Sequence, residues 1–240
     1  MADIANVRAL VFDVFGTLVD WRTSIARDLA AFGEARGIAC DWVAFVDAWR
    51  AAYVPSMDRV RRGDAPWTNL DALHAASFDE LAIRFDLPVL RADDRAWIVR
   101  RWHELPPWDD VPRGLARLHE RYVLGSLSNG NVALLVDLAR FAKLPFDTIF
   151  SAELYRRYKP DPEVYLGTVA LLGCEPGDVM LVATHNGDLA AARALGLRTA
   201  FVLRPTEYGP AQRNDLAPDP DNDVAVRDLL ELADRLGALG

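Results

Sequence analysis

The chain has little of what marks a secreted or membrane-bound protein. Only two cysteines, Cys40 and Cys174, occur among its 240 residues. Two are too few for a disulfide framework and are typical of a protein in a reducing compartment. The first residues contain no basic segment followed by a long apolar run, so we expect neither a signal peptide nor a membrane span. These absences predict a cytoplasmic protein.

Positive charge is also scarce. Lysine and arginine total 27 against 35 aspartates and glutamates, which gives a net charge of -8 at pH 7. Such a chain exerts no long-range attraction on nucleic acid or on an anionic membrane, and we expect neither as a partner. A small anionic substrate would be drawn only by a local positive pocket. The hydrophobic content of 51% is ordinary for a packed globular protein.

The most informative feature is Asp13, which ends the apolar run of residues 9–12. A short continuous apolar run is typical of a buried strand in a parallel sheet. Ligand sites in α/β folds lie at the carboxyl ends of such strands. Gly16 lets the backbone turn sharply beside the carboxylate. The alternative is a solvated aspartate that ends a strand before a turn.

Two more apolar runs, 122–127 and 178–183, predict strands that end in polar side chains. Between them, Lys159 stands before a proline at the start of a predicted helix. Because the carboxyl ends of parallel strands meet at one edge of a sheet, we expect these groups to gather near the first strand. The polar residues that follow the two runs are Ser128, Asn129, His185, Asn186 and Asp188.

Helix and strand patterns alternate from about residue 113 onward, which predicts an α/β fold with a doubly wound, Rossmann-like parallel sheet. Residues 22–97 instead show apolar residues at helical spacing, and residues 70–85 suggest a helical pair. Residues 204–210 and 217–220 are predicted to form a long surface loop. The predicted helices are 113–121, 131–142, 161–173, 188–196 and 226–237, and the later strands are 122–127, 147–151, 178–183 and 198–203.

The order of Asp13, then Ser-Asn, then Lys159, then Asp188 resembles the haloacid dehalogenase superfamily across nearly the whole chain. The resemblance implies a catalytic core of residues 1–18 and 98–240, with a helical cap of residues 19–97 inserted after the first strand.

Two positions differ from the phosphatases of that superfamily. Those enzymes carry an acid two residues after the nucleophile as a proton donor, and another acid four residues after the last aspartate to help hold Mg²⁺. Here the two positions are Phe15 and Ala192. Phenylalanine cannot transfer a proton, and Mg²⁺ prefers oxygen ligands. The chain is therefore more similar to the type II L-2-haloacid dehalogenases, which use no metal or other cofactor.

Dehalogenation suits these residues because a halide leaves as an anion and needs no proton. The resemblance implies that Asp13 attacks C2 of a 2-haloacid, expels halide and forms an aspartyl ester that water hydrolyses. Lys159 would keep the pKa of Asp13 low. Asp188 would pair with Lys159 and orient or deprotonate the water. The alternative for Asp188 is a helix N-cap.

Other residues match the dehalogenase pattern. Ser128 and Asn129 would bind the substrate carboxylate, although they also suit a turn by composition. Thr17 would bond Asp13 or nearby backbone. Arg50 would bind the departing halide, unless it is a surface arginine on an amphipathic helix. The other candidates for contact with the substrate or halide are Val14, Phe15, Tyr165, His185 and Asn186.

His185 and Gly187 depart from the best-known dehalogenase pattern. We interpret His185 as a group that positions water or stabilises a small halide such as fluoride, the alternative being a structural histidine bonded to a backbone carbonyl. The predicted substrates are short 2-haloalkanoic acids, namely haloacetates and 2-halopropionates, with fluoroacetate as a hypothesis. The family implies a homodimer. A Mg²⁺-dependent phosphatase of the same superfamily and a non-catalytic member remain the alternatives.

Overall fold

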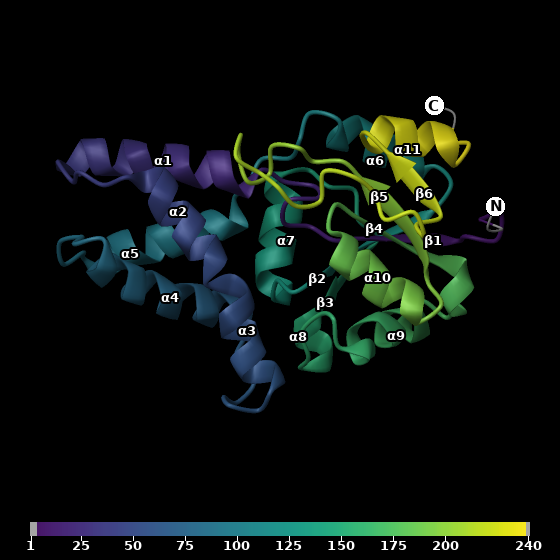
Figure 1. Cartoon of the computed structure of the whole chain (residues 1–240), viewed down its shortest axis with the longest axis horizontal. Coiled ribbons are helices and arrows are strands. Elements are labelled where there is room, and N and C mark those ends of the chain that lie inside the picture. Colours follow the sequence, from purple (N-terminus) through teal and green to yellow (C-terminus); the bar gives the residue numbers. More distant parts are fainter. Residues whose placement is uncertain (1–3, 239–240) are drawn as a thin grey trace.

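A single parallel sheet organises the protein, and the computed structural model describes residues 4–238 of it (Figure 1). The sheet has six strands in the order β3-β2-β1-β4-β5-β6. The predicted doubly wound α/β fold is thus confirmed, with one additional short strand, β6. The strands are β1 Ala9–Phe12, β2 Val123–Ser128, β3 Thr148–Ser151, β4 Val179–Ala183, β5 Arg198–Val202 and β6 Val224–Val226.

The central strands explain where polar side chains gather. Strand β1 pairs in parallel with β2 on one side and with β4 on the other, and Phe12 lies opposite Ser126 and Val182. Every residue of β1 is buried because helices cover both faces of the sheet. The carboxyl ends of β1, β2 and β4 therefore lie side by side, with Asp13 between the other two.

The predicted core helices match the structure with small shifts, and the short helices over residues 152–155 and 176–178 were not predicted. The exception is the predicted helix 226–237, which begins only at Leu229 because residues 224–226 pair with β5 as a strand. Among residues 4–238, no helix is long and apolar enough to cross a membrane. The core helices are α6 Val111–His119, α7 Val132–Phe141, α8 Ala152–Tyr155, α9 Pro162–Leu171, η2 Pro176–Asp178, α10 Asn186–Ala194 and α11 Leu229–Arg235.

A second group of helices follows β1 and lies to one side of the sheet in Figure 1. The predicted pair over residues 70–85 is wrong: these residues form one continuous helix, since the stretch contains no proline or glycine to break it. We propose that residues 19–97 form the inserted unit and that 1–18 and 98–240 form the core. The helices of this group are α1 Trp21–Arg36, α2 Trp42–Ala51, α3 Tyr53–Arg61, α4 Leu70–Arg84 and α5 Ala92–Val99, and the short helix η1 Arg100–His103 follows on the core side of the proposed boundary.

The segment after β5 is not the simple surface loop that the sequence predicted. Glu207 is fully buried, and Arg204 and Gln212 are only 6% exposed. The guanidinium of Arg204 makes two hydrogen bonds to Asp110, at 2.7 and 2.9 Å, and its Nε donates to the carbonyl of Thr17 at 2.9 Å. These contacts draw residues 204–212 inward against the carboxyl end of β1.

Candidate active site

Asp13 directly follows β1 and is 7% exposed. Lys159 Nζ donates to its Oδ1 at 3.0 Å, Thr17 Oγ1 donates to its Oδ2 at 2.9 Å, and His185 Nδ1 lies 3.2 Å from Oδ2. Burial alone would raise the pKa of Asp13, but Lys159 and His185 outweigh burial and hold it far below its usual range. The structure therefore places an ionised carboxylate at the strand end.

Lys159 holds the site together. Its Nζ contacts Asp13 and Asp188 and also donates to the Leu127 carbonyl at 2.9 Å. Its backbone N–H donates to Asn129 Oδ1 at 2.8 Å, so Asn129 orients the lysine as well as lining the cavity. Burial acts to lower the pKa of Lys159, but the two carboxylates raise it above its usual value. The lysine is thus a fixed cation between two acids.

Asp188 lies in the first turn of α10, which begins at Asn186 with His185 as its N-cap. The N-cap alternative for Asp188 is therefore wrong, because the helix starts two residues earlier than the sequence predicted. Tyr165 Oη donates to Asp188 Oδ1 at 2.6 Å, and Lys159 contacts the other oxygen. Burial raises the pKa of Tyr165, and Asp188 raises it further, so the phenol remains a donor. Both oxygens of Asp188 are thus held in place.

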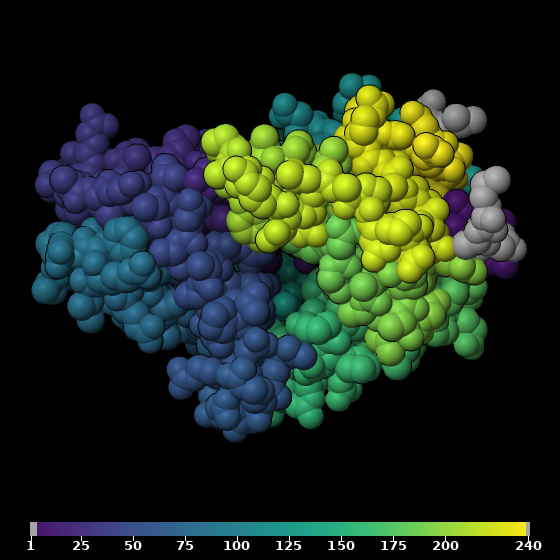
Figure 2. Space-filling view, in the orientation of Figure 1, coloured from purple at the N-terminus to yellow at the C-terminus, as the bar shows by residue number. Residues whose placement is uncertain are grey.

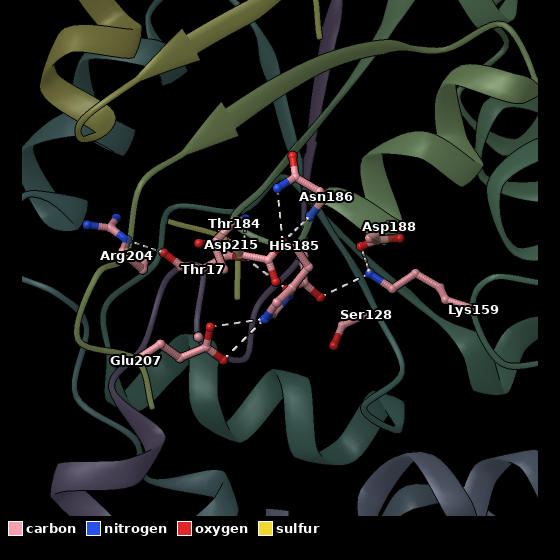
Figure 3. Close-up of polar contacts among 12 residues, drawn as sticks. Thr17, Ser128, Lys159, Thr184, His185, Asn186, Asp188, Arg204, Glu207 and Asp215 are labelled. Carbon is pink, nitrogen blue, oxygen red and sulfur yellow. Dashed lines mark hydrogen bonds and ion pairs between the residues drawn. The ribbon is translucent and has the colours of Figure 1, made fainter. Parts of the chain in front are cut away.

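His185 lies between two carboxylates, as Figure 3 shows for its contact with Glu207. Its Nδ1 faces Asp13, and its Nε2 lies 3.0 Å from Glu207 Oε2 and 3.2 Å from Oε1. Burial lowers the pKa of His185, but Glu207 and Asp13 outweigh burial and raise it well above 6.5. The structural alternative, a bond to a backbone carbonyl, is wrong.

Glu207 is the functional candidate that the sequence did not reveal. It belongs to no recognised motif, and only the fold of the segment after β5 brings it to the site. Trp21 Nε1 donates to its Oε1 at 3.1 Å. Gly16, at φ +84°, leaves room for it, since a Cβ there would lie 2.1 Å from Glu207 Oε1. The available sequence signal is Gly16, whose role extends beyond the predicted turn to this close contact.

Arg50 reaches the site from α2. Its NH2 lies 4.0 Å from Glu207 Oε1, and its side chain is 11% exposed. Its guanidinium carbon lies 4.3 Å from the ring centre of Tyr53 and 5.5 Å from that of Trp21. Its Nε and NH1 are buried with no hydrogen-bond partner among residues 4–238. The surface alternative for Arg50 is therefore wrong.

A cavity of about 370 Å³ opens over Asp13 between the inserted helices and the core. Figure 2 shows the hollow where the blue helices meet the green part of the core. Cationic and aromatic side chains therefore surround the carboxylate of Asp13. The predicted residues that line the cavity are Asp13, Phe15, Arg50, Asn129, Lys159, Tyr165, His185 and Asp188, and the lining also contains Tyr53 and Tyr208.

Four predicted residues do not line the cavity, and one of them, Thr17, instead donates to Asp13 Oδ2. Val14 is fully buried. Ser128 Oγ accepts from the N–H of Gly130 at 3.2 Å, as in the turn alternative. The structure corrects the prediction that Asn186 contacts the substrate or halide. Its amide donates instead to Asp215 Oδ1 at 3.0 Å and to the Ala217 carbonyl at 2.9 Å. It anchors the segment after β5 because it sits on the outer side of the first turn of α10 (Figure 3).

The chain is similar to several known proteins. A family model for haloacid dehalogenase-like hydrolases matches residues 7–196. The (S)-2-haloacid dehalogenase 4A of Burkholderia cepacia is 29% identical over 219 residues, which cover 85% of this chain and 88% of that protein.

Two crystal structures are also similar. The L-2-haloacid dehalogenase PA0810 has a TM-score of 0.94 and 50% identity, covering 97% of this chain and 100% of that one. The defluorinating L-2-haloacid dehalogenase Rha0230 has a TM-score of 0.93 and 46% identity, covering 96% and 95%. The chain therefore belongs to the family of haloacid dehalogenase-like hydrolases.

Proposed function

We propose that the protein hydrolyses short 2-haloalkanoic acids to 2-hydroxy acids through an aspartyl ester on Asp13. The observation that carries the proposal is the buried Asp13 carboxylate, bridged to Asp188 by Lys159 beneath a cavity that also contains Arg50. The names of the similar proteins, (S)-2-haloacid and L-2-haloacid dehalogenases, support it.

The hydrogen bonds of Asp13 indicate which oxygen attacks. Oδ2 accepts from Thr17 and contacts His185, whereas Lys159 is the one donor to Oδ1 among residues 4–238. A carboxylate oxygen has about two acceptor positions, so Oδ1 keeps a free lone pair. Oδ1 forms a bond to C2 of the substrate as the carbon–halogen bond breaks, and the halide leaves with the bonding electron pair.

Arg50 is the receptor for the departing halide. Its Nε and NH1 lack partners among residues 4–238, so the planar guanidinium has N–H groups free to donate to an anion. The nearby rings of Tyr53 and Trp21 keep the guanidinium dry, which strengthens its attraction for an anion.

Water completes the reaction by attacking Cγ of the ester. Asp188 is the group positioned to take the proton of the water, because Lys159 and Tyr165 fix its carboxylate beside Asp13. The bond between Cγ and Oδ1 then breaks, and Lys159 Nζ supplies a proton to the oxygen that leaves with the product. Lys159 recovers a proton from the new carboxyl group of Asp13, and Asp188 releases the proton of the water to solvent. The regenerated carboxylate retains one oxygen from water.

Haloacetates and 2-halopropionates are the proposed substrates, and fluoroacetate is included. Fluoride requires strong hydrogen-bond donors, and Arg50, whose Nε and NH1 lack partners among residues 4–238, lines the cavity. The similarity to a protein described as a defluorinating dehalogenase supports this extension. We further propose that the protein acts in the cytoplasm. We also propose that it forms a homodimer, and the elution volume in gel filtration would test this.

The deciding experiment measures halide release from chloroacetate, fluoroacetate and L-2-chloropropionate in EDTA, beside hydrolysis of p-nitrophenyl phosphate with Mg²⁺. Halide release in EDTA supports the proposal. Phosphate ester cleavage alone would favour the phosphatase alternative, against Phe15 and the apolar Ala192. Failure of every substrate would favour a non-catalytic member.

A further inference from the structure

The charges buried at the site are balanced. Three carboxylates, those of Asp13, Asp188 and Glu207, have side chains that are at most 10% exposed. The groups that pair with them are Lys159, His185 and Arg50. Burying an uncompensated charge is costly. The three negative charges are matched by three positive charges only when His185 is protonated.

The geometry of the His185 ring agrees with that charge. A neutral imidazole has one donor and one acceptor, whereas the imidazolium has two donors. Both ring nitrogens face carboxylate oxygens, Nδ1 facing Asp13 and Nε2 facing Glu207. The other groups near the Glu207 carboxylate, Trp21 Nε1 and Arg50, are themselves donors. Glu207 thus presents only acceptors to the ring.

Resting on the proposed function, we infer that cationic His185, held by Glu207, stabilises the oxyanion formed when water attacks the aspartyl ester. Attack at Cγ places a negative charge on Asp13 Oδ2, the oxygen not bonded to the substrate. Thr17 Oγ1 lies 2.9 Å and His185 Nδ1 lies 3.2 Å from that oxygen in the resting protein. The two donors form an oxyanion hole around the nucleophile itself. Glu207 is a positioning residue that keeps the ring charged and oriented.

This role differs from that of a general base. A doubly protonated ring cannot accept the proton of the water, and Nδ1 points at Asp13. Asp188, held by Tyr165 and Lys159, remains the base. Apart from Glu207, the charged or titratable groups around the ring are those that line the cavity with it, Asp13, Arg50, Tyr53, Asp58, Arg61, Lys159, Tyr165, Asp188 and Tyr208.

Glu207→Gln tests the charge of His185 with little change in shape. The Gln oxygen can still accept from Trp21 Nε1, and its amide can donate to His185 Nε2. His185 then becomes neutral while Nδ1 still donates to Asp13. Charge-assisted hydrogen bonds are roughly twice as strong as neutral ones, so we expect hydrolysis of the ester to slow on the order of tenfold or more. His185→Gln should slow it by about 10²–10³, as for the loss of an oxyanion-hole donor.

Rapid quenching with mass spectrometry of the intact protein reports each half-reaction with chloroacetate. We expect halide release in the first turnover to stay near the wild-type rate in Glu207→Gln, while the aspartyl ester accumulates. The pH profile of ester hydrolysis adds a second readout: the rate should fall as His185 loses its proton, and this fall should move to lower pH in the variant. A hydrolysis rate equal to wild type, or one that rises with the loss of that proton, overturns the inference.

Asp147→Asn is the matched control. His119 Nε2 lies 2.8 Å from Asp147 Oδ1 on the exposed surface, so the variant removes the carboxylate partner of a histidine outside the site. It should leave both half-reactions unchanged. If wild-type protein forms no ester and releases no halide, the proposed function fails and the inference fails with it. If the ester forms but Glu207→Gln and His185→Gln hydrolyse it at the wild-type rate, the inference fails while the proposed function stands.

Discussion

Lys159 Nζ lies 3.0 Å from Asp13 Oδ1, although 146 residues separate the two along the chain. The contact exists because Asp13 ends β1 and Asn129, at the end of the neighbouring β2, holds the backbone of Lys159. The sheet thus sets the distance between nucleophile and cation, and changes at either residue should affect chemistry more than folding.

Replacing Asp13 with asparagine should abolish turnover, because an amide is a poor nucleophile. Folding should persist, since asparagine has the same shape and Lys159 can still donate to its amide oxygen. Halide release measured with chloroacetate in EDTA checks the prediction, and the unfolding midpoint confirms the fold. Appreciable release by Asp13→Asn would exclude Asp13 as the nucleophile.

The pH profile should respond to Lys159. Burial favours a neutral Asp13, whereas Lys159 and His185 depress its pKa, so activity should persist to low pH in the wild type. Lys159→Met removes one of these cations, and the pKa of Asp13 should rise. The acid limb of the rate of ester formation should therefore move to higher pH, along with a loss of rate. The exposed Lys143→Met is the control; an unmoved acid limb in Lys159→Met would contradict this account.

Arg50→Ala should mainly slow cleavage of the carbon–halogen bond. Loss of one strong anion contact in a dry site costs about 2.7–4 kcal/mol, or about 10²–10³ in rate. Single-turnover halide release measures that step apart from ester hydrolysis. Arg59→Ala, on the exposed face of α3, is the control and should keep the wild-type rate. An Arg50 variant with normal halide release would mean that another group receives the ion.

Strand ends were the part of the site that the sequence predicted well. Asp13, Asn129 and Asp188 follow apolar runs at or just after the strand ends, and the parallel sheet necessarily gathers those ends. Glu207 gave no such signal because it lies in an irregular segment rich in turn residues. Its burial depends on Arg204, whose partner Asp110 is distant in sequence.

The sequence also could not show the direction in which a side chain points. Asn186 stands one residue from His185, yet helix α10 begins there and turns its amide toward Asp215. Position along the chain could not show this, since successive residues of a helix point about 100° apart. Val14 likewise directly follows Asp13 in the sequence and yet is fully buried.

Gly16→Ala should damage the site through Glu207. The added Cβ would lie 2.1 Å from Glu207 Oε1, and the positive φ of +84° disfavours alanine by about 1–2 kcal/mol. Gly37→Ala is a matched control, because Gly37 has φ +65° and a Cβ added there would meet no heavy atom within 4 Å among residues 4–238. Both variants should lose stability in urea unfolding because of the positive φ, and Gly16→Ala should lose more because its Cβ also meets the buried Glu207. Only Gly16→Ala should also slow ester hydrolysis, and equal kinetics in the two would contradict the role of the close contact.

Arg204→Met should test what holds Glu207 in place. Arg204 is 7% exposed and Asp110 13% exposed at their side chains, and breaking a buried pair by removing one partner costs about 3–5 kcal/mol. Urea unfolding at neutral pH measures this loss, with the exposed Arg213→Met as the control. Burial raises the pKa of Asp110, but Arg204 outweighs it and lowers that pKa below 3.8. The stabilisation is therefore complete above the unfolded pKa of about 3.9 and is lost as the pH falls through the lower folded value. The difference in unfolding free energy between wild type and Arg204→Met should thus become smaller in acid. If this difference instead grew on acidification, the charge of the pair would not be what holds the segment.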